Sequence, residues 1–100
     1  MPAVVRIGDS LSTGHGCSAS TTLASANQGS VFVNGILAAV VGAATVPHPF
    51  PPDPPCAPHV ANLNAGSSSV FVEGKPLGRV GDSADAGAMT SGSPNVSAGP

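Results

Sequence analysis

The sequence predicts a small all-β domain that contains about three β-hairpins. An internal repeat supports this prediction, because residues 30–35 (Ser-Val-Phe-Val-Asn-Gly) match residues 69–74 (Ser-Val-Phe-Val-Glu-Gly). Each copy joins a β-forming run to a turn pair, and Asn34-Gly35 is the strongest two-residue signal for a hairpin. Gly and Pro, at 13 and 11 of 100 residues, interrupt almost every stretch in which a long helix would form.

The remaining elements follow from shorter copies of the same unit. Residues 2–10 resemble residues 76–83, and both segments end in Gly-Asp-Ser, a turn that stops a strand. A degenerate copy of the first half of the repeat unit occupies residues 91–99. Because one unit is cut across the termini, we expect the chain ends to lie close together and the hairpins to form a ring. The prediction is one domain, residues 1–100, with repeat pieces at about 1–16, 28–48, 66–87 and 90–100.

Composition excludes several functions. The three basic residues, Arg6, Lys75 and Arg79, are too few for a nucleic-acid-binding protein or a basic membrane-surface helix. The longest nearly apolar run, residues 36–46, is too short to span a bilayer. Because no cationic start precedes an apolar segment, we expect no secretory signal and synthesis in the cytoplasm. Only 3% of residues are aromatic, which implies a small hydrophobic core. A core of this size favours an additional stabilising element, such as a bound metal ion.

A proline-rich segment, residues 47–59, separates the two best repeats and has seven prolines in thirteen residues. This composition predicts polyproline II broken by turns near Asp53-Pro54. One interpretation is a stiff linker, or a ligand for an aromatic groove, since residues 49–52 fit the pattern PxxP. The other interpretation is a metal-binding loop, because the segment holds two of the three histidines and a cysteine.

The candidate metal ligands are His15, His48, Cys56 and His59. Three imidazoles and a thiolate form a complete tetrahedral set for Zn²⁺, and the C-x₂-H spacing of Cys56 and His59 lets one loop supply two ligands. His15 and His48 each follow a hairpin end, so the repeat brings equivalent loops to one place. The alternative is three unrelated surface histidines and a buried thiol. Four protein ligands leave no open position for water, so the predicted site is structural.

The proline-rich segment places a condition on this site. A straight polyproline segment would hold His48 and Cys56 roughly 25 Å apart. Both residues can bind one ion only if the chain folds back between them, most plausibly at Asp53-Pro54-Pro55.

The two cysteines, Cys17 and Cys56, permit one disulfide. Synthesis in the reducing cytosol instead favours free thiols or metal ligation. Cys17 is the rival thiol for the metal site, and we prefer Cys56 because Cys17 would crowd His15 in an extended segment.

Residues 8–11, Gly-Asp-Ser-Leu, match the nucleophile block of the GDSL hydrolases. The downstream Asp-x-x-His of those enzymes is absent, because Asp53 and Cys56 occupy that spacing without a histidine. The same triplet recurs at residues 81–83, at an equivalent hairpin end. This recurrence favours a turn in which Asp caps backbone N–H groups, so we expect no enzymatic activity.

Residues 2–9 (Pro-Ala-Val-Val-Arg-Ile-Gly-Asp), followed by Gly14-His15-Gly16, resemble the PAAR-repeat proteins. The resemblance covers nearly the whole chain, since residues 30–35 and 90–96 also fit the family's pattern. It implies a conical, β-rich cap with pseudo-three-fold repeats and one structural Zn²⁺ near the apex. In this chain the family's three histidines and one cysteine would be His15, His48, His59 and Cys56. The sequence departs from the pattern at Val4-Val5 and at Ala43, where the middle repeat lacks its Asp.

The resemblance also implies a function. Such proteins cap and sharpen the trimeric β-helical central spike of contractile injection machines, either the phage tail baseplate or the VgrG-type spike of type VI secretion. We therefore expect a monomer, one copy per spike trimer, located in the virion or at the tip of the secretion spike, which helps to pierce an envelope.

The spike-binding surface and two alternative functions complete the expectations. The Val-Phe-Val hairpins are the predicted interface, with Phe32 and Phe71 as anchors; the alternative is that both rings form the monomer core. One alternative function is a small zinc-dependent hydrolase that uses the three histidines. The other is a PAAR adaptor that carries a non-covalent effector.

Overall fold

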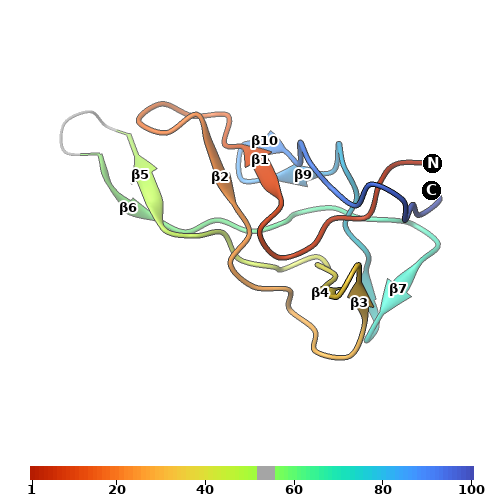
Figure 1. The fold of residues 1–100 in the computed structure, drawn as a ribbon. Helices are drawn as coiled ribbons and strands as arrows, with labels where there is room; N and C mark the ends of the chain where they lie inside the picture. The colour runs from red at the N-terminus through yellow and green to blue at the C-terminus, as the bar shows by residue number, and fades with distance from the viewer. Residues whose placement is uncertain (52–55) are drawn as a thin grey trace.

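The computed structural model describes residues 1–51 and 56–100, and it confirms the predicted all-β class, since no helix occurs among these residues. Short antiparallel strands pair in two-stranded sheets (Figure 1). In this part of the chain there is accordingly no helix long and apolar enough to cross a membrane. The strands are β1 (Ser10–Ser12), β2 (Ser20–Thr22), β3 (Phe32–Val33), β4 (Ile36–Leu37), β5 (His48–Phe50), β6 (Ala57–His59), β7 (Phe71–Val72), β8 (Lys75–Pro76), β9 (Ser83–Ala84) and β10 (Gly87–Ala88).

Backbone hydrogen bonds at the centre of the molecule follow a three-fold pattern. The N–H of Val5 donates to the carbonyl of Gly78 (3.0 Å), that of Gly78 to Ala39 (2.9 Å), and that of Ala39 to Val5 (3.0 Å). The three bonds close a ring, to which each repeat contributes one residue. The predicted ring of repeats is therefore confirmed, and its axis passes between these three residues.

After the ring, each repeat makes the same tight turn. The turn glycines Gly8, Gly42 and Gly81 have φ of 88°, 95° and 93°, a left-handed conformation that favours glycine. The residue after each glycine donates its N–H to the carbonyl three positions earlier, at 3.0 Å in all three turns. The chain then reverses into a second hairpin. The Gly-Asp turn signal predicts that a strand ends at this turn, which is correct. The second hairpin that follows the turn in each repeat was not predicted.

An arginine and an aspartate brace two of these turns. The guanidinium donates from two nitrogens to both oxygens of the carboxylate, at 3.0–3.2 Å, and the arginine's backbone N–H adds a third bond. The middle repeat has buried Val40 and Ala43 at the corresponding positions, and its turn forms without the pair. The two braced pairs are Arg6–Asp9 and Arg79–Asp82.

At the broad end of the molecule, two complete hairpins and one open hairpin surround the axis. The pairs β3–β4 and β7–β8 turn at Asn34-Gly35 and Glu73-Gly74, where all four residues have positive φ, as a type I′ turn requires. The third pair is formed by the first and last segments of the sequence and has no connecting turn. Its two sides meet at the bridge between Ala3 and Ser97, and both termini lie at this end (Figure 1). The predicted proximity of the chain ends is confirmed.

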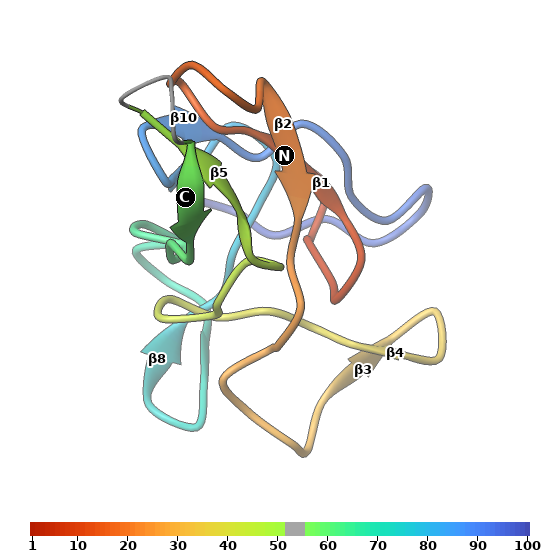
Figure 2. The same ribbon diagram turned by 90° about the vertical axis from the view of Figure 1, so that its left-hand side faces the viewer.

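At the narrow end, the hairpins β1–β2, β5–β6 and β9–β10 rise from the three repeats (Figures 1 and 2). The molecule measures 40 × 23 × 22 Å and tapers toward β5–β6. The predicted polyproline II linker is wrong for the described part of residues 47–59, because β5 and β6 pair antiparallel with His48 opposite His59. The proposed reversal at residues 53–55 lies outside the described residues.

Small aliphatic side chains fill the core, in two clusters along the axis. One cluster lies toward the narrow end and includes Val5, Leu11, Leu23 and Leu63, which are at most 1% exposed. The other lies at the broad end around Val4 and equivalent residues of the other repeats. Neither cluster includes a phenylalanine, so the interpretation of Phe32 and Phe71 as monomer core is wrong; they are 59% and 54% exposed.

Candidate metal centre

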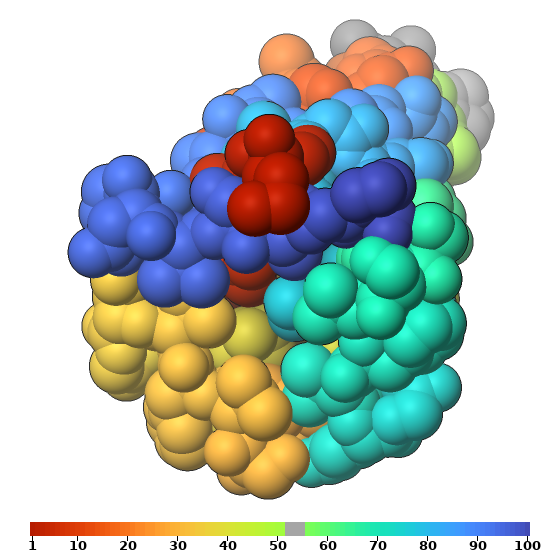
Figure 3. Space-filling model, turned by 90° about the vertical axis from the view of Figure 1, so that its right-hand side faces the viewer, coloured from red at the N-terminus to blue at the C-terminus, as the bar shows by residue number. Residues whose placement is uncertain are grey.

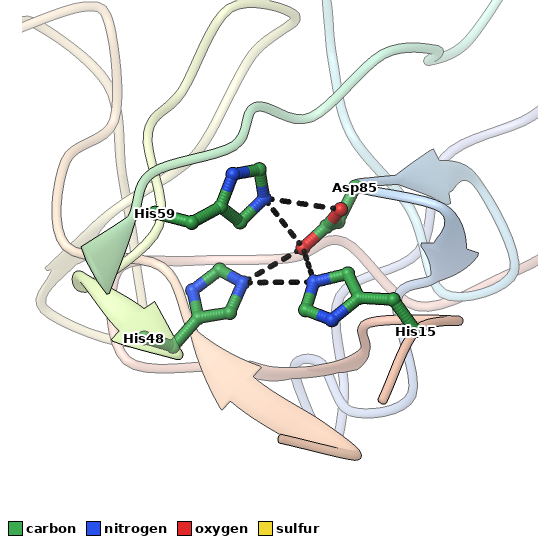
Figure 4. A group of neighbouring side chains, drawn as sticks. All are labelled: His15, His48, His59 and Asp85. Carbon is green, nitrogen blue, oxygen red and sulfur yellow. Dashed lines mark hydrogen bonds and ion pairs between the residues drawn. The ribbon is translucent and has the colours of Figure 1, made fainter. Parts of the chain in front are cut away.

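The three hairpins at the narrow end, β1–β2, β5–β6 and β9–β10, bring three histidines and one aspartate together (Figure 4). The first repeat supplies His15 from the loop after β1, and the second supplies His48 and His59 from opposite positions in β5 and β6. The third supplies Asp85 from the turn between β9 and β10. One ligand atom from each residue lies within 4.8 Å of all the others. Every repeat therefore contributes to one site close to the narrow end.

The distances between these atoms suit ligands that share one ion. The Nε2 atoms of His15 and His48 are 3.2 Å apart, and each lies 2.8–2.9 Å from Oδ2 of Asp85. Nε2 of His59 lies 3.4 Å from both carboxylate oxygens of Asp85. In a tetrahedral Zn²⁺ site with bonds of about 2.0 Å, neighbouring ligand atoms are about 3.3 Å apart. The separations of 2.8–3.4 Å bracket this value, and all four ligand atoms lie within 4.8 Å of one another.

Backbone carbonyls fix which nitrogen of two imidazoles faces the cluster. Nδ1 of His15 lies 2.9 Å from the carbonyl of Gly16, and Nδ1 of His48 lies 2.9 Å from the carbonyl of Val46. Because a carbonyl only accepts, each Nδ1 carries the proton, and in the neutral ring Nε2 then presents a lone pair. Two lone pairs and a carboxylate consequently point at one another. Such an arrangement requires a positive charge between them, either an added proton or a metal ion.

The protonation equilibria agree with a site that attracts positive charge. The hydrogen bond to the Gly16 carbonyl raises the pKa of His15; burial opposes this effect and the Asp85 carboxylate adds to it. Burial alone would raise the pKa of Asp85, but its contacts with His48, His15 and His59, which are hydrogen bonds when a proton occupies Nε2, outweigh burial and hold that pKa below its usual value. The Asp85 side chain is only 5% exposed and remains a carboxylate, which is the form that binds a metal.

Phe50, which no sequence motif marks as part of the site, covers part of the cluster. Its ring centroid lies 4.7 Å from that of His15 and 4.4 Å from that of His59. The ring remains 39% exposed, so it forms a partial apolar wall between the imidazoles and solvent. The apolar wall lowers the local dielectric and strengthens the interaction of the ligands with an ion.

The fourth residue of the cluster is not the one that the sequence predicted as a ligand. Sγ of Cys56 is bonded to Sγ of Cys17 in a disulfide, with the Cα atoms 5.9 Å apart. A disulfide sulfur carries no thiolate, so Cys56 does not join the cluster in this state, and the expectation of free thiols is wrong here. Asp85 takes the fourth place. It follows the second Gly-Asp-Ser turn, which belongs to the third repeat, and the rule that equivalent loops meet would have identified it if applied to all three repeats.

The Gly-Asp-Ser triplets act as turns in the structure, as the recurrence predicted. Asp9 accepts three hydrogen bonds from Arg6 and one from the hydroxyl of Ser91, at 2.7–3.2 Å. The hydroxyl of Ser10 contacts that of Thr90 at 3.1 Å. The aspartate is therefore committed to bracing the turn.

Comparison with known families agrees with this architecture. The family model described as PAAR motif matches residues 13–92, which include all four residues of the cluster. Among curated proteins, none matches the chain. The PAAR motif is associated with structural spike-tip proteins of contractile injection and type VI secretion systems. Since the match spans most of the sequence, the chain belongs to the PAAR-motif family.

Proposed function

We propose that this chain, as one domain over residues 1–100, caps the trimeric β-helical spike of a contractile injection machine, of a phage tail or a type VI secretion system. The pseudo-three-fold ring is the observation that supports this proposal most strongly. A monomer whose three repeats surround one axis offers three similar edges, and a trimer ends in three identical edges. One copy per trimer therefore satisfies all three edges, which would otherwise be open to aggregation.

The broad end is the proposed spike-binding base. Three lobes surround a central hollow there: residues 28–37 (gold), residues 66–76 (teal) and the two chain termini (red and blue) (Figure 3). Phe32 and Phe71 project from the first two lobes and are more than half exposed. We propose that they insert between residues of the spike.

The third lobe differs from the other two in a way that breaks the symmetry. Ser97 pairs with Ala3, just as Phe32 pairs with Leu37 and Phe71 with Pro76. Ser97 therefore holds the position of the two phenylalanines. Two aromatic anchors and one serine make the base pseudo-symmetric, and the serine reduces the apolar area that the free protein exposes.

The narrow end is the proposed piercing tip, with a structural metal ion that we infer to be Zn²⁺. His15, His48, His59 and Asp85 would hold the ion, and four protein ligands leave no open position for a substrate or water. The ion would supply cross-linking between the three repeats. The side chains of this site position one another and are largely buried, which suits mechanical strength and argues against the zinc-hydrolase alternative.

Co-expression with a trimeric spike β-helix tests the proposal. Native mass spectrometry of the purified complex should give one copy of this chain per three spike chains. Binding of three copies per trimer, or no binding to spike trimers of either machine, would contradict the proposed function. A matched control is the same spike with its terminal β-helical turns removed, which should bind no cap.

A further inference from the structure

The disulfide Cys17–Cys56 lies directly beside the metal-site histidines. Cys17 is two residues after His15, and Cys56 is three residues before His59. The bond joins the loop of the first repeat to the β5–β6 hairpin of the second, across a sequence separation of 39 residues. It therefore links the two chain segments that supply all three imidazoles.

Apart from the disulfide, the loop that carries His15 is held mainly through Thr13, whose hydroxyl contacts the His15 backbone and the Ser18 carbonyl. Thr13 anchors its base, because its N–H donates to Ala19 (3.0 Å) and its carbonyl accepts from Ala86 (2.9 Å). Gly14 packs so closely on Ala86 that a Cβ would lie 2.2 Å from the Ala86 carbonyl oxygen. Beyond His15 the loop is exposed, and the disulfide at Cys17 is its covalent attachment to the rest of the tip. His15 is thus fixed by packing on one side and by the disulfide on the other.

We propose that Cys17–Cys56 is an oxidation-dependent lock that raises the metal affinity of the tip. This inference rests on the metal site of the proposed function. With the lock closed, His15 is held opposite His48 and His59 before an ion arrives, so less conformational freedom is lost on binding. With the lock open, the His15 loop moves independently of the β5–β6 hairpin and metal binding weakens.

The closing step is a thiol–disulfide exchange. The thiols of Cys17 and Cys56 lose two protons and two electrons to a disulfide oxidant, which is reduced to two thiols as the Sγ–Sγ bond forms. Cys17 is exposed, so an oxidant can reach it. A chain made in a reducing compartment would keep the lock open, and it would close on entry into an oxidising one.

Metal titration of the full chain tests the lock. Three proteins are compared: the oxidised chain, with free thiols shown absent by a thiol reagent; the same chain after reduction with a phosphine; and the double variant Cys17→Ser/Cys56→Ser. Zn²⁺ affinity is measured by competition with a chromogenic chelator, and Co²⁺ spectra report whether sulfur binds the ion. Circular dichroism confirms that each form is folded. Asp85→Asn serves as the control that weakens binding whether or not the disulfide is present.

The lock predicts one ion per chain in all three forms, with affinity at least about tenfold higher in the oxidised chain than in the double variant. Equal affinities in these two forms would overturn the lock while leaving the metal site intact. Tighter binding by the reduced chain, with a thiolate-to-cobalt charge-transfer band, would overturn it as well, because a cysteine would then be a ligand. Absence of metal binding in every form would show that the proposed metal site itself is wrong.

Discussion

Gly78 offers the sharpest test of the three-fold ring, because its position leaves no space for a side chain. A Cβ at this residue would lie 2.5 Å from Cδ2 of Leu63, 2.7 Å from Cγ2 of Val5 and 3.1 Å from the carbonyl oxygen of Ala39. Leu63 and Val5 are at most 1% exposed, so neither can move away into solvent. Overpacking of this kind costs about 1–3 kcal/mol. At about 4–8 °C per kcal/mol for a domain of this size, Gly78→Ala should lower Tm by about 10 °C.

Chemical denaturation measures the change in the free energy of unfolding and thermal denaturation measures the shift in Tm, both followed by far-ultraviolet circular dichroism with the disulfide intact and the metal content held constant. Gly29→Ala is the matched control, since its Cβ would meet no atom within 4 Å and its backbone needs no positive φ. The control should be neutral or stabilised by up to about 1 kcal/mol. Adding Val5→Ala to Gly78→Ala should recover part of the loss, because it removes one of the clashing methyl groups. Equal stability of Gly78→Ala and Gly29→Ala would refute the close packing at the ring.

Three further predictions concern the base, its pH dependence and the braced turns. Phe71→Ser should leave the free energy of unfolding within about 0.5 kcal/mol of the parent but weaken spike binding at least about tenfold; if the isolated variant unfolds instead, Phe71 is not an anchor. Hydrogen bonds from the Ser30 hydroxyl and a neighbouring backbone N–H lower the pKa of Glu73 below its ordinary 4.5. The ionised Glu73 therefore stabilises the fold fully above pH 4.5, and this stabilisation is lost as the pH falls through the lowered pKa of the folded state. Urea unfolding of Glu73→Gln across this range should show a shallower pH dependence than the parent, and parallel curves would exclude the assigned contacts. Asp82→Ala should lower Tm because it leaves the Arg79 guanidinium without its carboxylate partner. Adding Arg79→Val, which reproduces the residues of the middle repeat, should restore part of this loss. Simple additivity of the two losses in Tm would argue against a stabilising Arg79–Asp82 pair.

The fold was largely predictable because the residues of its turns, which recur in each repeat, specify the hairpins locally. Asn34-Gly35 and Glu73-Gly74 occupy turns in which both residues need positive φ, and each follows a Val-Phe-Val run. The second hairpin of each repeat was harder to predict. Strands such as Ser83–Ala84 and Gly87–Ala88 are two residues long and carry no β-branched or aromatic side chain. Their pairing depends on the ring below them, which is a tertiary effect.

The site was predictable in part, for a related reason. Histidines are rare in this chain, and His15, His48 and His59 all join the cluster. Asp85 was missed because an aspartate in a turn has an ordinary structural explanation, and nothing local distinguishes it from Asp9 or Asp82. Cys56 was predicted as a ligand but lies in a disulfide, because its pairing depends on the oxidation state and on the approach of Cys17 from another repeat. Neither factor can be deduced from spacing along the chain.

X-ray absorption spectroscopy at the zinc edge, on the oxidised full-length chain, tests the central claim most directly. The claim is that three repeats converge on one metal ion at the narrow end. It predicts one zinc ion per chain with three imidazole ligands and one carboxylate oxygen, and with zinc content reduced in Asp85→Asn. A sulfur scatterer at about 2.3 Å, or a preparation that retains no stoichiometric metal, would contradict it.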